Sequence, residues 1–128
     1  MRDDSGAAVV EFLLVSIVLI ALLMGVVQVG LYLHVRNVVA ASAAEGARFA
    51  ANYREQATAG GPVAHNIIAG ALSARVANGI TCTGSDQAGD GGVALVAVRC
   101  TGTVPLVFSW LGSIPGLNVS AHAMKETG

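Results

Sequence analysis

Charged residues are scarce in this chain of 128 residues, at 12% of the total against 54% hydrophobic residues. Soluble globular domains usually carry about 25% charged residues, so the composition indicates a membrane protein. The seven basic residues are scattered, and the net charge is -1. Because no basic stripe can follow a phosphate backbone, we exclude nucleic acid as a partner. The short chain has room for one small domain, which argues against a large enzyme.

Clustered catalytic or metal-binding side chains are also missing. The three histidines, His34, His65 and His122, lie on different predicted elements, and a lone histidine is more often a surface or packing residue than a base or ligand. Asp86 and Asp90 resemble part of a calcium loop, but its closing glutamate is absent. No Ser/His/Asp or Cys/His set is present. We therefore expect no enzymatic activity, no metal and no cofactor.

The longest apolar segment runs from residue 12 to residue 33 and contains no charged residue. At 1.5 Å per residue, such a helix reaches about 33 Å, enough to cross a hydrocarbon core of about 30 Å. A cleaved secretory signal peptide, the alternative, needs a basic start and a shorter apolar run of about 7 to 15 residues. Here Arg2 is offset by Asp3 and Asp4. We interpret the segment as a retained membrane-spanning helix.

The helical pattern continues past this segment, because no proline or paired glycine interrupts it before Gly60-Gly61-Pro62. Apolar and polar residues then separate onto two sides of a helix. We assign the apolar side to Val35, Val38, Val39, Ala43, Gly46, Phe49, Ala50 and Tyr53, and the polar side to Ser42, Glu45, Arg48, Asn52 and Glu55. One helix of about 70 to 75 Å is predicted from about Ala7 to about Glu55.

Residues 63–76 show a second, shorter helical pattern, with Pro62 suited to the first helical position. Period-two alternation then predicts three strands, at residues 80–83, 95–100 and 117–123, with a turn at residues 84–92. The predicted fold class is α+β. It comprises a long N-terminal transmembrane helix that extends into a second short helix and a small three-stranded antiparallel sheet.

The apolar stretch at residues 104–115 is predicted to be a loop between the last two strands. Its aromatic side chains, Phe108 and Trp110, have two possible roles: they cap the small core, or they contact a partner or the membrane surface. We expect the capping role.

Cys82 and Cys100 fall in the strands that flank the predicted turn, each on the face assigned to the core. Two thiols without a nearby histidine do not make a tetrahedral zinc site, so we predict a disulfide. Closing this loop would stabilise the tail by about 3 kcal/mol in the chain-entropy model. A disulfide also requires an oxidising compartment.

One acidic residue, Glu11, begins the otherwise uncharged helix. A carboxylate at the edge of an apolar region carries a desolvation cost, which makes it a functional candidate whose partner has to be named. The alternative is an anion in the first turn of a helix, where the positive end of the helix dipole favours it. On charge alone, both interpretations stay open.

The segment around Glu11 resembles type IV pilins, in which a prepilin peptidase cuts after a glycine and a glutamate is the fifth mature residue. Counting Ala7 as the first mature residue makes Glu11 the fifth. Gly6, small residues, Glu11, Phe12 and an apolar helix together resemble TadE-like proteins, as does the stretch AASAAEGARFAA at residues 40–51. These proteins are minor pilins or pseudopilins of the Tad (Flp) tight-adherence type IVc pilus.

The resemblance implies a role in pilus assembly and adhesion. Cleavage between Gly6 and Ala7 would free an amine, with which Glu11 of a neighbouring subunit could pair, because two buried charges are tolerable only as a pair. Implied partners are a prepilin peptidase, other pilins and pseudopilins, and the Tad assembly platform. Two pairs of small residues, Ala21 with Gly25 and Gly46 with Ala50, would permit close helix packing between subunits.

The predicted organisation has four parts: a leader at 1–6, a transmembrane helix at 7–33, an amphipathic extension at 34–56 and an α+β tail at 62–128. Arg36 and Arg48 follow the span, whereas Arg2 precedes it, a distribution that weakly favours a cytoplasmic tail. We give more weight to the disulfide and to the cytoplasmic action of prepilin peptidases. The protein is therefore expected in the cytoplasmic membrane, single-pass, with its tail outside and possible incorporation in the pilus. The alternative is an uncleaved single-pass protein with a small extracytoplasmic binding domain.

Overall fold

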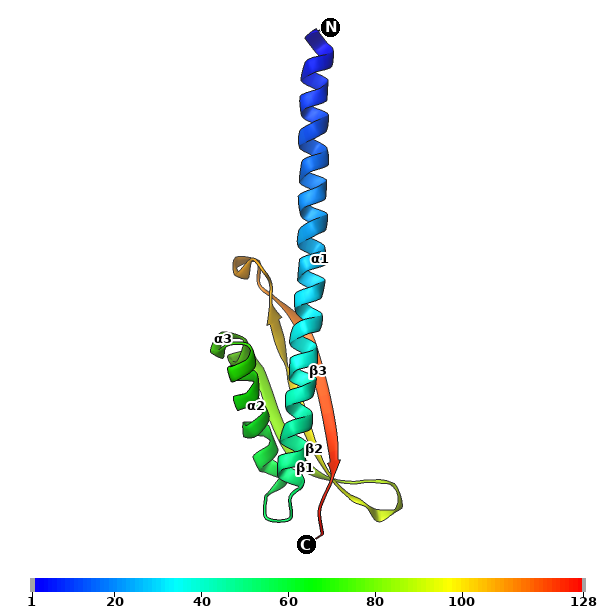
Figure 1. Cartoon of the computed structure of the whole chain (residues 1–128), viewed down its shortest axis with the longest axis vertical. Coiled ribbons are helices and arrows are strands. Elements are labelled where there is room, and N and C mark those ends of the chain that lie inside the picture. The colour runs from blue at the N-terminus through cyan, green and yellow to red at the C-terminus, as the bar shows by residue number, and fades with distance from the viewer. Residues whose placement is uncertain (1, 128) are drawn as a thin grey trace. The chain divides into compact units, whose positions relative to one another are not determined.

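The longest element is helix α1, Arg2–Ala51 (Figure 1), in a computed structural model that describes residues 2–127. No proline interrupts its backbone hydrogen bonds. The helix begins before the predicted Ala7 and ends before the predicted Glu55. It ends where the chain turns at Asn52, whose backbone N–H and side-chain amide both donate to the carbonyl oxygen of Phe49, at 3.3 and 3.2 Å.

The chain divides into two units, Met1–Tyr32 and Leu33–Gly128. The described part of the first unit is helical throughout, and most of its apolar side chains are exposed, with Met24 and Tyr32 half-buried. The most apolar window of α1 has a mean hydropathy of 2.8 and is 0% buried. By its length and composition, this helix is able to cross a membrane, as predicted.

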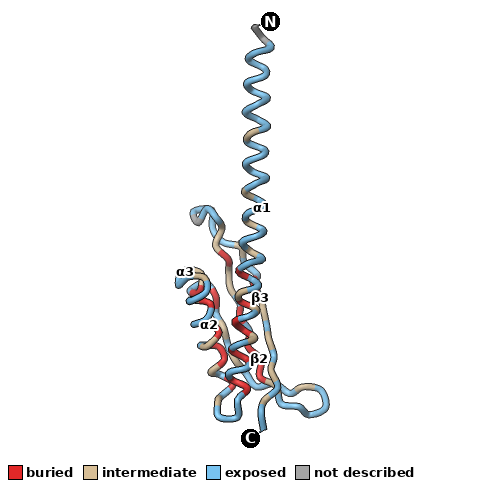
Figure 2. The backbone as a smooth tube through the Cα atoms, in the orientation of Figure 1, coloured by how far each residue is buried: buried red, intermediate tan, exposed pale blue. Residues whose placement is uncertain are grey.

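The second unit contains the predicted three-stranded antiparallel sheet, in the order β1-β2-β3. Its strands are β1, Ile80–Ala88, β2, Ala94–Pro105, and β3, Ser113–Met124. In the central strand, Val96, Val98 and Cys100 are buried and Arg99 is exposed (Figure 2). Ala97, on the opposite face, is also buried, at 4% exposure. The period-two pattern thus identified the inner face correctly.

The predicted turn at residues 84–92 is too long. Strand β1 continues to Ala88, which pairs with Ala94, so the connection is confined to the residues between these two. Gly84 therefore lies inside a strand, opposite Val98. A Cβ atom at this position would overlap the carbonyl oxygen of Ala57. Because Gly84 has no side chain, the backbone of Ala57 can approach the strand closely here, which is a common reason for glycine within a strand.

Helix α2, Gly60–Ala71, packs against the part of α1 in the second unit and against the sheet. The two helices approach closely at Gly46, where a Cβ atom would overlap the carbonyl oxygen of Gly60. Gly60 also faces the sheet, because a Cβ atom added to Gly60 would lie 2.6 Å from Cγ2 of Val98. Small residues thus allow α1, α2 and β2 to share one core.

The predicted helix at residues 63–76 is two helices. Helix α2 ends at Ala71, and the short helix α3, Ala74–Asn78, follows. Ser73 separates them, because its hydroxyl oxygen accepts a hydrogen bond from the backbone N–H of Val76 at 3.2 Å and caps α3. Pro62 is in the first turn of α2 but not at the first position, and no intrahelical bond is lost there because the first four N–H groups of a helix are unpaired.

Within the second unit, the buried side of α1 differs from the predicted apolar side, because one residue predicted to be exposed is buried and two aromatic residues predicted to be buried are exposed. Ser42, assigned to the polar side, is only 2% exposed. Its hydroxyl donates to the carbonyl oxygen of Val38 at 2.8 Å, which satisfies the polar group and permits its burial. Phe49 and Tyr53, assigned to the apolar side, are exposed, because the contact with α2 is built from small residues such as Gly46 and Ala50.

Candidate processing and assembly site

Gly6 and Ala7 both lie within α1, and both are exposed. A Cβ atom added to Gly6 would meet nothing within 4 Å, and the residue has no positive φ. Glycine in a helix interior costs about 1 kcal/mol relative to alanine. Neither packing nor backbone conformation within the chain therefore explains this glycine.

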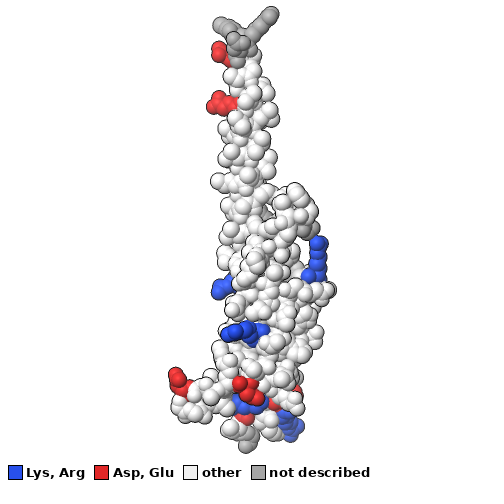
Figure 3. Space-filling model, turned by 180° about the vertical axis from the view of Figure 1, so that it is seen from behind, with Lys and Arg blue, Asp and Glu red and all other residues white. Residues whose placement is uncertain are grey.

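Glu11 lies four residues after Ala7 in the same helix, so the two residues share one face. The carboxylate is exposed, and no hydrogen bond or ion pair joins it to the side chains that the structure describes. By contrast, Glu45 on the same helix forms an ion pair with Arg48 at 3.4 Å. On the face that Figure 3 shows, acidic atoms lie near the N-terminal end of the long helix, before the segment 12–33 that contains no charged residue. Within the part of the chain that the structure describes, Glu11 is thus a carboxylate without a side-chain partner.

The two predicted pairs of small residues differ in their surroundings. Gly46 and Ala50 are buried inside the second unit, so the proposed use of this pair between subunits is wrong. At Gly25, by contrast, an added Cβ atom would meet nothing within 4 Å, and Ala21 is exposed on the same helix. The pair in the apolar segment remains available to a neighbouring helix.

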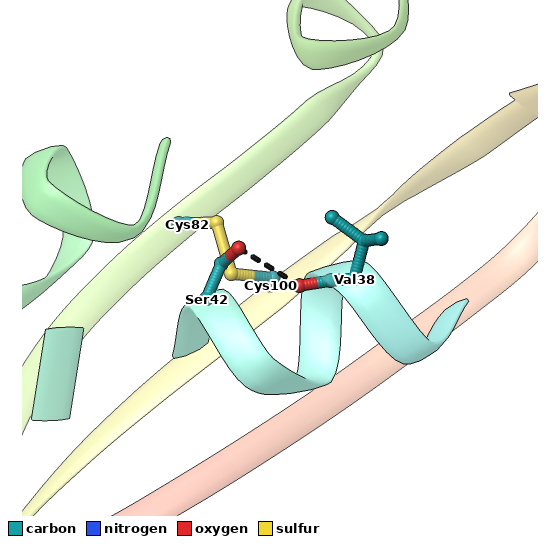
Figure 4. The surroundings of a disulfide bond; sticks show 4 residues. All are labelled: Val38, Ser42, Cys82 and Cys100. Carbon is teal, nitrogen blue, oxygen red and sulfur yellow. Dashed lines mark hydrogen bonds between the residues drawn. A yellow bond between two sulfur atoms is a disulfide. The ribbon is translucent and has the colours of Figure 1, made fainter. Parts of the chain in front are cut away.

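The disulfide between Cys82 and Cys100 is present, with its sulfur atoms 2.07 Å apart. The two residues face each other directly in the register of β1 and β2. Figure 4 shows Ser42 and Val38 of α1 in the surroundings of this bond. The disulfide is therefore part of the layer in which helix and sheet meet.

The outer face of the sheet carries a polar pocket of about 260 Å³. Its lining includes Arg99 and His122, and a ring nitrogen of His122 lies 3.2 Å from the side-chain oxygen of Gln87. No group of three potential metal ligands occurs among the residues that the structure describes. Asp86 and Asp90 are exposed, on β1 and in the following turn.

The expectation that Phe108 and Trp110 cap the core is wrong. Strand β2 extends to Pro105 and β3 begins at Ser113, so the connection is shorter than predicted. It contains a single 3-10 turn and leaves Phe108 46% and Trp110 81% exposed. The core is filled without these rings, by small and branched residues such as Val104.

Lys125 is a structural residue that the sequence pattern did not reveal. Its ammonium group donates to the carbonyl oxygens of Ala50 and Glu55, at 3.2 and 2.8 Å. A cation near the last turn of a helix is a known stabilising feature. Sequence patterns do not reveal this contact, because Lys125 and Ala50 are 75 residues apart in the chain.

A family model described as TadE-like protein matches residues 6–48. The matched segment begins at Gly6, contains Glu11 and ends at Arg48 of the EGAR stretch. No curated protein and no solved structure matches the chain. The resemblance inferred from the sequence is therefore confirmed over residues 6–48, and this N-terminal part of the chain is TadE-like.

Proposed function

We propose that this chain is the precursor of a minor pilin or pseudopilin of a Tad-type pilus, cut by a prepilin peptidase between Gly6 and Ala7. The TadE-like match begins at Gly6, and packing within the chain does not require a glycine there. The observation that carries the proposal is the position of Glu11, an exposed carboxylate without a described partner at the start of an apolar helix.

Assembly then depends on charge pairing in the membrane. Cleavage frees an amine on Ala7, and Glu11 of one subunit pairs with this amine of a neighbour. Either charge alone would be costly in the bilayer, whereas the pair is tolerated. Ala21 and Gly25 allow the two helices to approach closely enough for this contact.

The proposed location is the cytoplasmic membrane, crossed once by α1, with the tail outside the cytoplasm. The disulfide supports this orientation, because such bonds persist in oxidising compartments. The partners are a prepilin peptidase, other pilins and pseudopilins, and the Tad assembly platform. The role is one of structure and assembly, without catalysis.

Glu11→Ala tests the assembly step in cells that carry the matching pilus system. The variant should insert into the membrane and be cut normally but fail to support pilus assembly. Glu45→Ala is the matched control, since it removes an exposed glutamate from the same helix together with its ion pair to Arg48. Normal piliation of the Glu11 variant, or equal loss in both variants, would show that Glu11 makes no specific assembly contact.

The alternative function is that of an uncleaved single-pass protein whose tail binds a ligand. The polar pocket on the outer face of the sheet favours a small polar ligand in that case. Under this alternative, Arg99→Ala would abolish ligand binding by the tail, and Glu11→Ala would not. For a pilin we expect the reverse: pilus assembly fails in the Glu11 variant and persists in the Arg99 variant.

A further inference from the structure

The connection between β2 and β3 presents an apolar surface to the outside. We call residues 106–112 the hairpin loop. Its exposed side chains are Val107, Phe108, Trp110 and Leu111. The surrounding sequence is also uncharged, because no Asp, Glu, Lys or Arg occurs between Arg99 and Lys125. Such a cluster is more apolar than an ordinary solvent-exposed loop.

The hairpin loop is closed by its own hydrogen bonds. The N–H of Leu106 donates to the carbonyl oxygen of Gly112 at 3.2 Å, and the N–H of Leu111 donates to the carbonyl oxygen of Phe108 at 2.9 Å. Gly112 has a φ of 109°, a conformation that favours glycine. In the loop closed in this way, Phe108 and Trp110 are both exposed.

Within the second unit, the direction of β2 relative to residues 33–51 of α1 follows from two layers of the core. Val96 packs in one cluster with Ala50, and Cys100 lies in the layer of Ser42 (Figure 4). From the first layer to the second, the strand rises about 13 Å and the helix about 12 Å. The two elements therefore run side by side in opposite chain directions.

The same geometry places the hairpin loop at the end of the second unit where Leu33 enters it. From Cys100 to Leu106 the strand rises about 20 Å, whereas from Ser42 back to Leu33 the helix rises about 14 Å. The loop therefore reaches at least the level of Leu33. Figure 1 shows the loop at this end of the second unit. Leu33 is also the last residue of the apolar segment, where a spanning helix leaves the hydrocarbon core.

We propose that the hairpin loop inserts its side chains into the interfacial region of the lipid bilayer, beside the point where α1 leaves it. Tryptophan favours this region because its ring is apolar while its N–H bonds to water or headgroups. The interfacial layer extends about 5 to 8 Å beyond the hydrocarbon core, within reach of the loop. This inference rests on α1 crossing the membrane, but not on cleavage or pilus assembly.

Trp110 reports on this contact directly, because it is the single tryptophan of the chain. The full chain is placed in vesicles of phosphatidylcholine and phosphatidylglycerol, and its tryptophan fluorescence is recorded with and without lipids brominated near the headgroup. We expect a blue-shifted emission, strong quenching by the brominated lipid and a severalfold lower quenching by aqueous acrylamide than for a solvated indole. Water-like emission without lipid quenching would overturn the proposal.

The matched control carries Trp110→Phe together with Met124→Trp. Met124 is 71% exposed and lies at the other end of β3, so the introduced indole should be quenched by acrylamide and not by lipid. Equal lipid quenching at both positions would contradict specific insertion of the loop.

Two further outcomes are distinguished in the same vesicles. In the first, Trp110 is protected from acrylamide but is not quenched by the brominated lipid, and the protection disappears when the protein is diluted. This result would mean that a second copy covers the loop, and it would overturn the proposal. An alkaline wash tests the span separately. Retention of the protein with a water-like Trp110 refutes the loop contact alone, whereas release of the protein refutes the membrane span and the loop contact together.

Discussion

The ammonium group of Lys125 lies 3.2 Å from the carbonyl oxygen of Ala50, 75 residues earlier in the chain. The same group donates to the carbonyl oxygen of Glu55, and the next residue, Glu126, donates its backbone N–H to Ala51 at 2.8 Å. The end of β3 thereby provides partners for carbonyl groups that the end of a helix leaves unpaired. These bonds join the last strand to the long helix.

Lys125→Met should therefore destabilise the tail. Hydrogen bonds to a charged group contribute about 1.5 to 3 kcal/mol, and the carbonyls would lose a partly buried donor. Hydrogen exchange of the β2 amides in the full chain, held in detergent micelles, measures the change. Arg36→Met removes an exposed positive charge from α1 and should leave the exchange unchanged. Equal protection in the lysine variant and the wild type would contradict the capping role.

Removal of the disulfide should lower stability by about 3 kcal/mol, the chain-entropy value for a loop of this size, whose cysteines are 18 residues apart. Pulse proteolysis of the full chain in increasing urea, with and without reductant, measures the effect. In the double variant Cys82→Ala and Cys100→Ala, reductant should have no influence. An unchanged urea midpoint on reduction of the wild type would show that the bond does not support the tail.

Two glycines should respond oppositely to alanine substitution. Gly46→Ala brings a Cβ atom against the carbonyl oxygen of Gly60, and such overpacking costs about 1 to 3 kcal/mol. Gly70→Ala, in α2, meets nothing within 4 Å and should be neutral or stabilising by up to about 1 kcal/mol. Thermal unfolding of both variants in micelles gives the comparison. A neutral Gly46→Ala would mean that α1 and α2 do not approach closely.

The sequence predicted the elements that depend on local pattern. The apolar run, the helical periodicity after it and the alternation in β2 each identified a helix or strand, because burial of one face imposes the period. Cys82 and Cys100 were paired correctly for the same reason, since both lie on the inner face.

Features that depend on contacts between distant segments were missed or predicted wrongly. Gly84 looked like a turn residue, but it is needed where Ala57 approaches β1. Phe49 and Trp110 looked like core residues, yet the helices and sheet pack through smaller side chains and leave both exposed. Hydrophobicity alone does not tell a core side chain from one that is exposed in the isolated chain.

Of the proposed site, sequence alone supplied Gly6, Ala7 and Glu11, through their spacing and their resemblance to pilins. The structure adds that Gly6 is not required by packing and that Glu11 has no partner among the described side chains. It also shows that Gly46 and Ala50 are buried within the second unit, so they are not available for contacts with other subunits. Pairing with a neighbour involves a second molecule, which the sequence of one chain does not describe.

The most direct test of the account is the intact mass of the protein purified from cells that contain the matching prepilin peptidase. We predict a mature chain that begins at Ala7, and a full-length precursor when Gly6→Leu is introduced. Gly25→Leu, an equivalent change further along the same helix, should leave cleavage unaffected. A wild-type chain that retains Met1 in the presence of active peptidase would contradict the central claim.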